Sequence, residues 1–160
     1  MTPQERKTWV RMMGARRPWW DLRREAIVEP EWDVVDAHIH LWEERDLPDP
    51  QGGTSVLRSS RYMLPEFLRD AASGHRVAQC VYVECGSGYH TDGLDHLRPV
   101  GETEFAARVA KELSASRSGT ALGAVVAHAD LRHPELERVL DAHESRGGGL
   151  VKAVRHSGAR

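Results

Sequence analysis

Four short apolar segments that alternate with helix-like segments constrain the fold of this chain more than any other feature. The apolar segments cover about residues 33–41, 76–85, 121–130 and 150–156. Each is nearly continuous in apolar residues, as are strands that are buried on both faces. Such strands, separated by helices, predict an α/β fold with a parallel sheet covered by helices.

The intervening segments carry helix signals. They cover residues 64–73, 103–116 and a stretch from Pro134 to the glycines at 147–149. Pro65 lies in the first turn of the first segment, and the glycines are typical of a helix end and turn. The apolar residues expected to face inward are Phe105, Val109, Leu113, Leu136, Val139 and Leu140.

Two architectures fit this order of elements: a flavodoxin-like open sheet and part of a TIM-type (β/α)8 barrel. A full barrel takes about 250 residues, whereas this chain has 160. A barrel interpretation therefore gives about four of eight units, with residues 31–160 as the N-terminal half of the barrel domain. Residues 46–60, rich in Pro, Gly and Ser, are expected to form a loop.

Residues 1–30 are expected to form an irregular or weakly helical arm. Its tryptophans, Trp9, Trp19 and Trp20, are suited to anchoring it on the domain surface. Its first 24 residues are locally basic, but an early Glu5 and the absence of serine favour a surface arm over a targeting segment.

Composition narrows the class of partner. The net charge of -2 gives no overall case for nucleic-acid binding, and no apolar run approaches the roughly 20 residues of a membrane helix. Cys80 and Cys85 are separated by an odd interval on one strand, so they are expected to be unpaired, buried thiols. Together with the lack of a secretory signal, this predicts a cytoplasmic protein.

The sequence VVDAHIHLW places two histidines in the first strand. Alternation puts Asp36, His38 and His40 on one face with Val34, and the apolar face, Val35, Ala37, Ile39 and Leu41, against helices. Imidazoles at i and i+2 can converge on one metal ion, polarise a carbonyl or hold a charged substrate. The alternative is a pair of hydrogen-bonded core histidines.

The other strands also end in polar residues, at the edge where ligands bind to parallel sheets. These residues are Glu84, His128, Asp130, Arg155 and His156. Glu84, His128, Arg155 and His156 are candidate substrate-binding residues, and an arginine fork suits a carboxylate. The structural alternatives are a loop-start role for Glu84 and a turn cap for Asp130.

Two glycine-containing stretches and the serines do not add a motif. The RGGGL stretch at 146–150 follows a helix and precedes a strand, the reverse of a phosphate-binding loop. The GSGY stretch at 86–89 follows a strand but lacks the lysine and spacing of such loops. No serine lies in a nucleophile-elbow motif.

The segments VVDAHIHLW, YMLPEFLRD, VAQCVYVECGSGY, LRPVGETEFAARVA, GAVVAHADL and AVRHS resemble successive segments of the amidohydrolase superfamily, in its amidohydrolase-related branch. The resemblance covers about residues 19–157. It implies a (β/α)8 barrel that hydrolyses an amide, ester or lactone bond of a small substrate. It also implies that His38 and His40 are catalytic and bind a divalent metal, commonly zinc, although some relatives work without metal.

The chain departs from that family's pattern because the later strands, which supply a further histidine and an acidic residue, are not present. Two histidines fall short of the three protein ligands usual for catalytic zinc. The chain is therefore expected to be a truncated hydrolase, inactive alone unless it forms a homo-oligomer or pairs with a second fragment. The alternatives are a non-catalytic half-barrel that acts as a dimerising module, and a metal phosphoesterase that opens with His-x-His.

Overall fold

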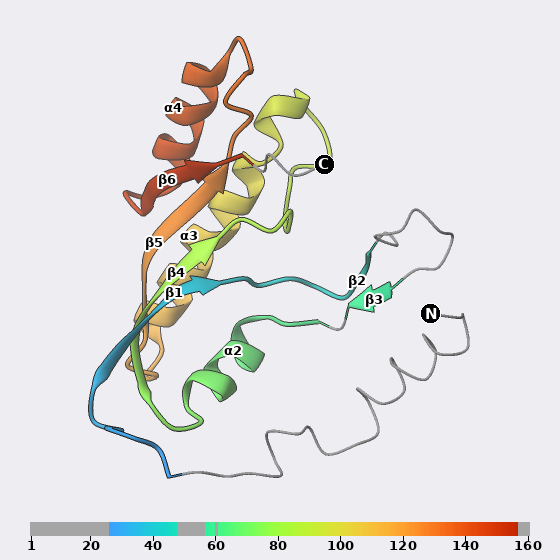
Figure 1. Cartoon of the computed structure of the whole chain (residues 1–160). Coiled ribbons are helices and arrows are strands. Elements are labelled where there is room, and N and C mark those ends of the chain that lie inside the picture. Colours follow the sequence, from blue (N-terminus) through green and yellow to red (C-terminus); the bar gives the residue numbers. More distant parts are fainter. Residues whose placement is uncertain (1–25, 48–56, 60, 157–160) are drawn as a thin grey trace.

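The computed structural model describes residues 26–47, 57–59 and 61–156, and its centre is a four-stranded parallel sheet (Figure 1). The strands are β1 (Asp33–Ile39), β4 (Arg76–Val83), β5 (Ala121–His128) and β6 (Val151–Arg155). They lie side by side in chain order, β1-β4-β5-β6. The prediction of an α/β fold with a parallel sheet is confirmed.

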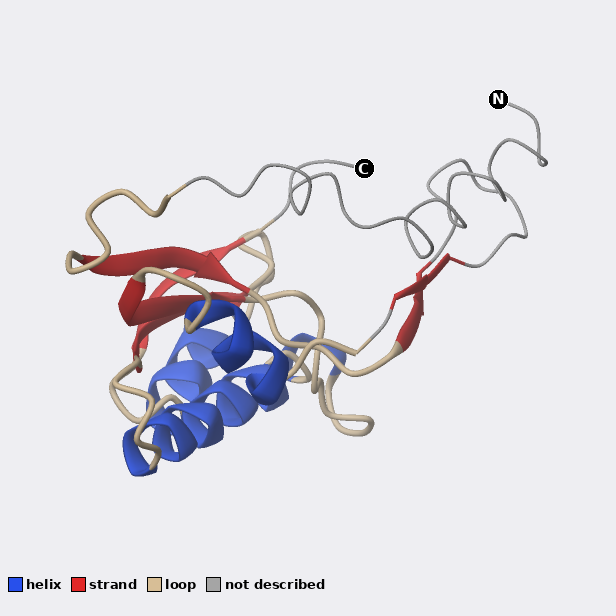
Figure 2. Ribbon diagram, turned by 90° about the horizontal axis from the view of Figure 1, so that it is seen from below, coloured by secondary structure: helices blue, strands red, loops and turns tan. Residues whose placement is uncertain are grey.

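Three α-helices connect the successive strands of this sheet. They are α2 (Leu64–Ala71), α3 (Val100–Ala115) and α4 (Leu136–Arg146). Figure 2 shows that the helices lie on one side of the sheet. Right-handed crossovers that always step in the same direction produce this arrangement. Among the described residues no helix covers the opposite face, so the predicted helical cover is found on one face.

The strand order discriminates between the two architectures that fitted the sequence. In a flavodoxin-like sheet the chain reverses direction, so that the third strand lies on the far side of the first. Here the third strand, β5, pairs with the second, β4. The described strands are therefore consecutive β/α units added in one direction, and the flavodoxin-like order is excluded for them.

Element boundaries differ from the prediction mainly at the strand ends and in the loops. β4 and β5 each end two residues early, and α3 begins three residues early, at Val100. The 86–101 segment, predicted as a loop, contains the short 3-10 helix η2 (Asp95–Leu97). At the two ends of the predicted 46–60 loop, β2 (Arg45–Leu47) and β3 (Leu57–Ser59) form an antiparallel pair.

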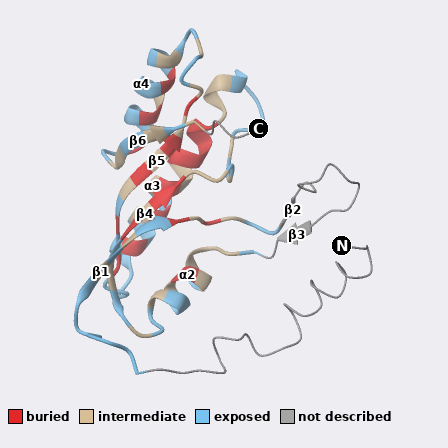
Figure 3. Ribbon diagram, in the orientation of Figure 1, coloured by how far each residue is buried: buried red, intermediate tan, exposed pale blue. Residues whose placement is uncertain are grey.

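The hydrophobic core lies between the sheet and its helices (Figure 3). Val109 and Leu113 of α3 are buried as predicted, and Phe105 packs against the core from a half-buried position. Val139 of α4 is also buried, but Leu140 is 39% exposed, so that prediction is wrong. The reason is that α4 turns Val139 and the residue one turn later, a histidine, toward the core.

Other sequence predictions have mixed outcomes. Neither cysteine forms a disulfide, as predicted, and Cys80 is buried, but Cys85 is only half-buried. The glycine turn after α4 is confirmed, since Gly148 and Gly149 have φ of 59° and 79°.

Most of the predicted arm, including Trp9, Trp19 and Trp20, lies outside the described residues. None of the described helices has the length and apolar character needed to cross a bilayer.

Candidate functional site at the strand ends

His38 and His40 meet at the end of β1 on the sheet face that carries no described helix. Ile39 and Leu41 are buried in the core, so alternation turns the two histidines to the opposite face. Their Nε2 atoms lie 3.0 Å apart, and the rings meet edge to face with centroids 4.7 Å apart. The two imidazoles therefore meet on one face, as predicted from strand alternation.

Asp36 does not share their face, so the predicted trio is wrong. Asp36 pairs with Cys80 and Ile39 pairs with Tyr82, which leaves two residues of β1 opposite one of β4. This β-bulge breaks the alternation and turns Asp36 to the helix side, with Cys80. The main-chain N–H of His38 donates to Asp36 Oδ1 at 3.1 Å. Asp36 therefore contacts the main chain within the bulge.

The first half of β1 also lies outside the core. Val35 is 56% exposed and Ala37 is exposed, although both were predicted to pack against helices. Only Ile39 and Leu41, beyond the bulge, reach the core. The core-facing alternation of β1 thus begins at the bulge rather than at the start of the strand.

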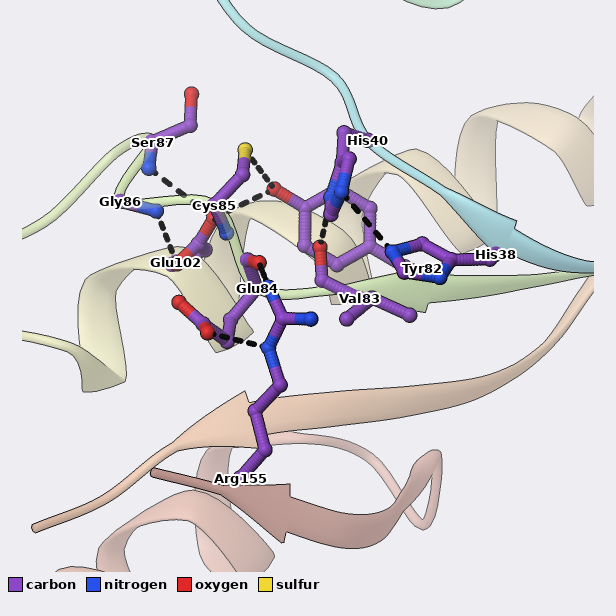
Figure 4. A network of polar contacts seen from close by, with 10 residues as sticks. All are labelled: His38, His40, Tyr82, Val83, Glu84, Cys85, Gly86, Ser87, Glu102 and Arg155. Carbon is purple, nitrogen blue, oxygen red and sulfur yellow. Dashed lines mark hydrogen bonds and ion pairs between the residues drawn. The ribbon is translucent and has the colours of Figure 1, made fainter. Parts of the chain in front are cut away.

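His40 is held in one tautomer by a main-chain carbonyl. Its Nδ1 lies 2.7 Å from Val83 O, which can only accept, so Nδ1 carries the proton (Figure 4). In the neutral ring the lone pair is then on Nε2, and it accepts a hydrogen bond from His38 Nε2. A carbonyl bound to the far nitrogen is also the usual support of a metal-binding histidine.

The histidine pair supplies two ligands of a metal site but not a complete set. Two nitrogens at 2.0–2.1 Å from a tetrahedral zinc ion lie about 3.4 Å apart, close to the observed 3.0 Å. However, no group of three histidine, cysteine or carboxylate side chains able to hold a metal occurs among the described residues. A third ligand would have to come from elsewhere.

A cleft of about 350 Å³ adjoins the histidine pair between β1 and α2. Ile39 and Phe67 form part of its apolar lining. On its wall Trp42 and Tyr62 stack with ring centroids 5.4 Å apart. The hydroxyl of Tyr62 donates to Asp70 Oδ2 at 2.8 Å, and burial, with this bond, raises the pKa of Tyr62 to about 12. The cleft has the size of a small-molecule site.

Glu84 and Arg155, both predicted as substrate-binding residues, contact each other. Arg155 Nε donates to Glu84 Oε1 at 2.6 Å, and Nη2 donates to Glu84 O at 2.7 Å (Figure 4). Glu84 follows β4 and Arg155 ends β6, so the pair spans the intervening β5. Of the three guanidinium nitrogens of Arg155, Nη1 is the one that does not bind Glu84.

His128 and His156 also come together, with ring centroids 5.9 Å apart, and Tyr89 lies 6.5 Å from His128. Asp130 accepts from the main-chain N–H and the guanidinium of Arg132 at 3.0 and 3.1 Å. These bonds lower the pKa of Asp130 to about 2. The turn-cap interpretation of Asp130 is therefore confirmed.

The sequence analysis missed Glu102, a buried carboxylate that fixes the loop after β4. Its Oε1 accepts from Tyr82 OH at 2.8 Å, and from the N–H groups of Cys85 and Ser87 at 2.8 and 3.1 Å; Oε2 accepts from Gly86 N–H at 3.3 Å. Burial and the nearby carboxylate raise the pKa of Tyr82. Glu102 lies in the first turn of α3, where acidic residues are favoured, but the predicted helix began one residue later.

His143 of α4 was missed as well. It is fully buried, its Nδ1 lies 2.7 Å from Thr103 Oγ1, and its Nε2 lies 3.0 Å from His128 O. Because the carbonyl only accepts, Nε2 donates and Nδ1 accepts from the threonine hydroxyl. Burial lowers the pKa of His143, which keeps the ring neutral. The signal in the sequence was its position one turn after Val139.

Comparisons of the chain with protein-family models, curated proteins and solved structures find no match. Function is therefore inferred from the strand-end residues. The structure joins them in three groups: His38 with His40, Glu84 with Arg155, and His128 with His156.

Proposed function

We propose that these β/α units belong to a barrel-type hydrolase of the amidohydrolase-related kind, acting on an amide, ester or lactone bond of a small substrate. One observation carries the proposal. His40 is fixed by Val83 O so that its Nε2 faces His38 Nε2 at 3.0 Å, beside a cleft of small-molecule size. A structural histidine pair would be expected in the core, whereas His38 is exposed.

The chemistry follows from the tautomers. The N–H of His38 can donate to a substrate carbonyl oxygen in place of His40, and thereby polarise it. His40 Nε2, released from that bond, can accept a proton from a water molecule as the water oxygen bonds to the carbonyl carbon. The bond from that carbon to the leaving group then breaks, and His40 Nε2 passes the proton to the leaving group. Acid–base catalysis of this kind contributes about 10²- to 10⁴-fold to a rate.

A divalent ion, zinc by the family resemblance, would supply Lewis-acid activation of water when bound. His38 and His40 would hold it through Nε2. The described residues supply these two ligands and no group of three. Because the same Nε2 atoms would bind the ion, the hydrogen-bonding roles given above describe the site without it.

The remaining strand-end groups suit substrate binding. We assign Arg155, through the part of its guanidinium that does not bind Glu84, to a polar or carboxylate group of the substrate. His128 and His156, which lie together at the ends of β5 and β6, are assigned to the same substrate. The partner of this site is therefore a small molecule.

The test is hydrolysis of an aryl ester, a lactone and an anilide by the purified chain, with and without added zinc. His38→Ala and His40→Ala should each lower the rate at least about 100-fold. The matched control is His75→Ala, which removes an exposed histidine that contacts Val28 O, and it should keep the rate. Equal rates in wild type and the two histidine variants would contradict the proposal, and no hydrolysis of any of the three bonds would show that the chain alone does not form a complete site.

A further inference from the structure

The sheet face opposite the helices is apolar in its middle. Tyr82 and Val125 belong to the core between the sheet and the helices, so alternation turns Val81, Val83 and Val126 to the opposite face. No helix of the described residues covers that face (Figure 2), and Val81 and Val126 are only half-buried. Parallel strands that are apolar on both faces are normally covered on both. The open face therefore lacks a second layer within the part of the chain that the structure describes.

The two outer strands of the sheet are also open. Among the described strands β1 pairs with β4 alone, and β6 pairs with β5 alone. Each outer strand therefore presents one row of main-chain N–H and C=O groups that no described strand uses. Edges of this kind are templates for pairing with another chain.

The two edge strands carry opposite charges. β1 contains Asp33 and Asp36 and no lysine or arginine, whereas β6 contains Lys152 and Arg155 and no acidic residue. The spacing of the two charges is the same in both strands. Lys152 is exposed and has no ion-pair partner in the described part of the chain. One edge is therefore the electrostatic complement of the other.

Neighbouring ion pairs reduce these charges but do not cancel them. Asp33 pairs with Arg76 of β4, and Arg155 pairs with Glu84. With these two partners counted, the β1 edge retains one negative charge and the β6 edge retains one positive charge. The complementarity of the edges thus persists in the folded chain.

Opposite charges favour one way of pairing two copies of the chain. Joining β1 to β1, or β6 to β6, places like charges opposite each other, which destabilises a cross-strand contact. Joining β6 of each copy to β1 of the other places opposite charges together. A two-fold axis along the strands produces this contact at both edges at once and keeps all strands parallel.

We propose that a second copy of this chain covers the open face, with β6 of each copy paired in parallel with β1 of the other. The two four-stranded sheets then form a closed ring of eight strands with the helices outside. Eight strands give a barrel whose interior is just filled by side chains. Closure pairs the main-chain groups of both edges and buries the valines of the open face.

The dimer has a consequence for the candidate site. The end of β6 in the second copy comes to lie beside the end of β1, where His38 and His40 lie. Arg155 and His156 of the second copy then border the pocket next to the histidine pair. This consequence for substrate rests on the proposed function, whereas the dimer itself does not.

Sedimentation velocity of the purified full chain tests the dimer. The wild type should sediment with twice the mass of one chain at about 100 µM and dissociate on dilution. Lys152→Glu leaves both edges of a copy negative, and Asp33→Lys leaves both positive. Each single variant should raise the Kd of the dimer at least about 10-fold. The matched control is Lys111→Glu, at an exposed position of α3, which should dimerise like the wild type.

A mixture of the two edge variants separates this pairing from any other. Lys152→Glu in one copy and Asp33→Lys in the other restore opposite charges at both junctions, so the mixture should recover a dimer with nearly the wild-type Kd. Both positions are exposed, and recovery would also show that each variant folds.

A wild-type chain that stays monomeric would overturn the proposal, because the edge charges would then serve to keep the edges unpaired. A dimer that Lys152→Glu does not weaken, or a mixture of folded variants that does not associate, would overturn it as well. Sedimentation needs no substrate, so these results are independent of whether the chain hydrolyses any bond.

Discussion

Arg155 binds Glu84 through both the side-chain carboxylate and the main-chain carbonyl, and it does so across an intervening strand. Arg155 is the last residue of β6, and Glu84 follows the last residue of β4. The contact therefore connects two strands that are not hydrogen-bonded to each other. It fixes the spacing of the strand ends at which the candidate substrate-binding residues lie.

This pairing predicts a measurable coupling. Arg155→Lys keeps the charge but loses the fork, and a double-mutant cycle with Glu84→Gln should give about 1 kcal/mol in the free energy of unfolding by urea. The Arg61–Glu43 pair, in which both side chains are about half exposed or more, is the reference and should give less than about 0.5 kcal/mol. Equal couplings would mean that the Arg155 contact is an ordinary surface pair.

Glu102 predicts a larger effect from a smaller chemical change. In Glu102→Gln an amide NH₂ replaces one of the oxygens that accept the N–H groups of residues 85–87. The free energy of unfolding should fall by about 2–3 kcal/mol, because a buried donor is left unsatisfied. Glu112→Gln, at an exposed position of the same helix, should change it by less than about 0.5 kcal/mol. Similar urea midpoints for the two variants would show that the buried carboxylate is dispensable.

His143 predicts a pH dependence of stability. Burial lowers its pKa in the folded protein, so on acidification the unfolded chain binds a proton that the folded chain does not. The contribution of His143 to the free energy of unfolding is therefore complete above the ordinary histidine pKa of about 6.5, and it is lost as pH falls below that value. In urea titrations from pH 8 to 5, His143→Gln should lose less stability than the wild type.

The control for that titration is His75→Gln, which should follow the wild-type profile because this histidine is exposed. Each protein gives a slope of the free energy of unfolding against pH, and the difference between two slopes removes the contribution of the histidines that both proteins share. An identical slope in His143→Gln and wild type would contradict a neutral, buried His143.

The apolar periodicity of the sequence was sufficient to predict the four strands of the parallel sheet and the three helices between them, because each of these elements buries a continuous face. It could not predict the bulge in β1. A bulge depends on the register against the partner strand, and the pairing of Asp36 with Cys80 is not encoded in the spacing of residues 36–40 alone. The error in the position of Asp36 has this origin.

The start of α3 escaped prediction for a tertiary reason. Its first residues, Val100 and Gly101, are poor helix formers. A Cβ at position 101 would lie 2.5 Å from Gly88 O, so the glycine is needed where the loop crosses the helix. Because the predicted helix began after this turn, Glu102 was placed outside it and its role could not be foreseen. The pairing of His38 with His40, by contrast, followed from local alternation.

The loop after β4 has a consequence for protein engineering. Glu102 anchors its first residues, and a bond from His90 N–H to Arg98 O at 3.0 Å closes its base. The tip at Asp92 and Gly93 is exposed, and nothing lies within 4 Å of a Cβ built at Gly93. A peptide inserted between these two residues would therefore lengthen only the tip and leave the strand ends in place. The fold thus offers a graft point in the loop that follows β4.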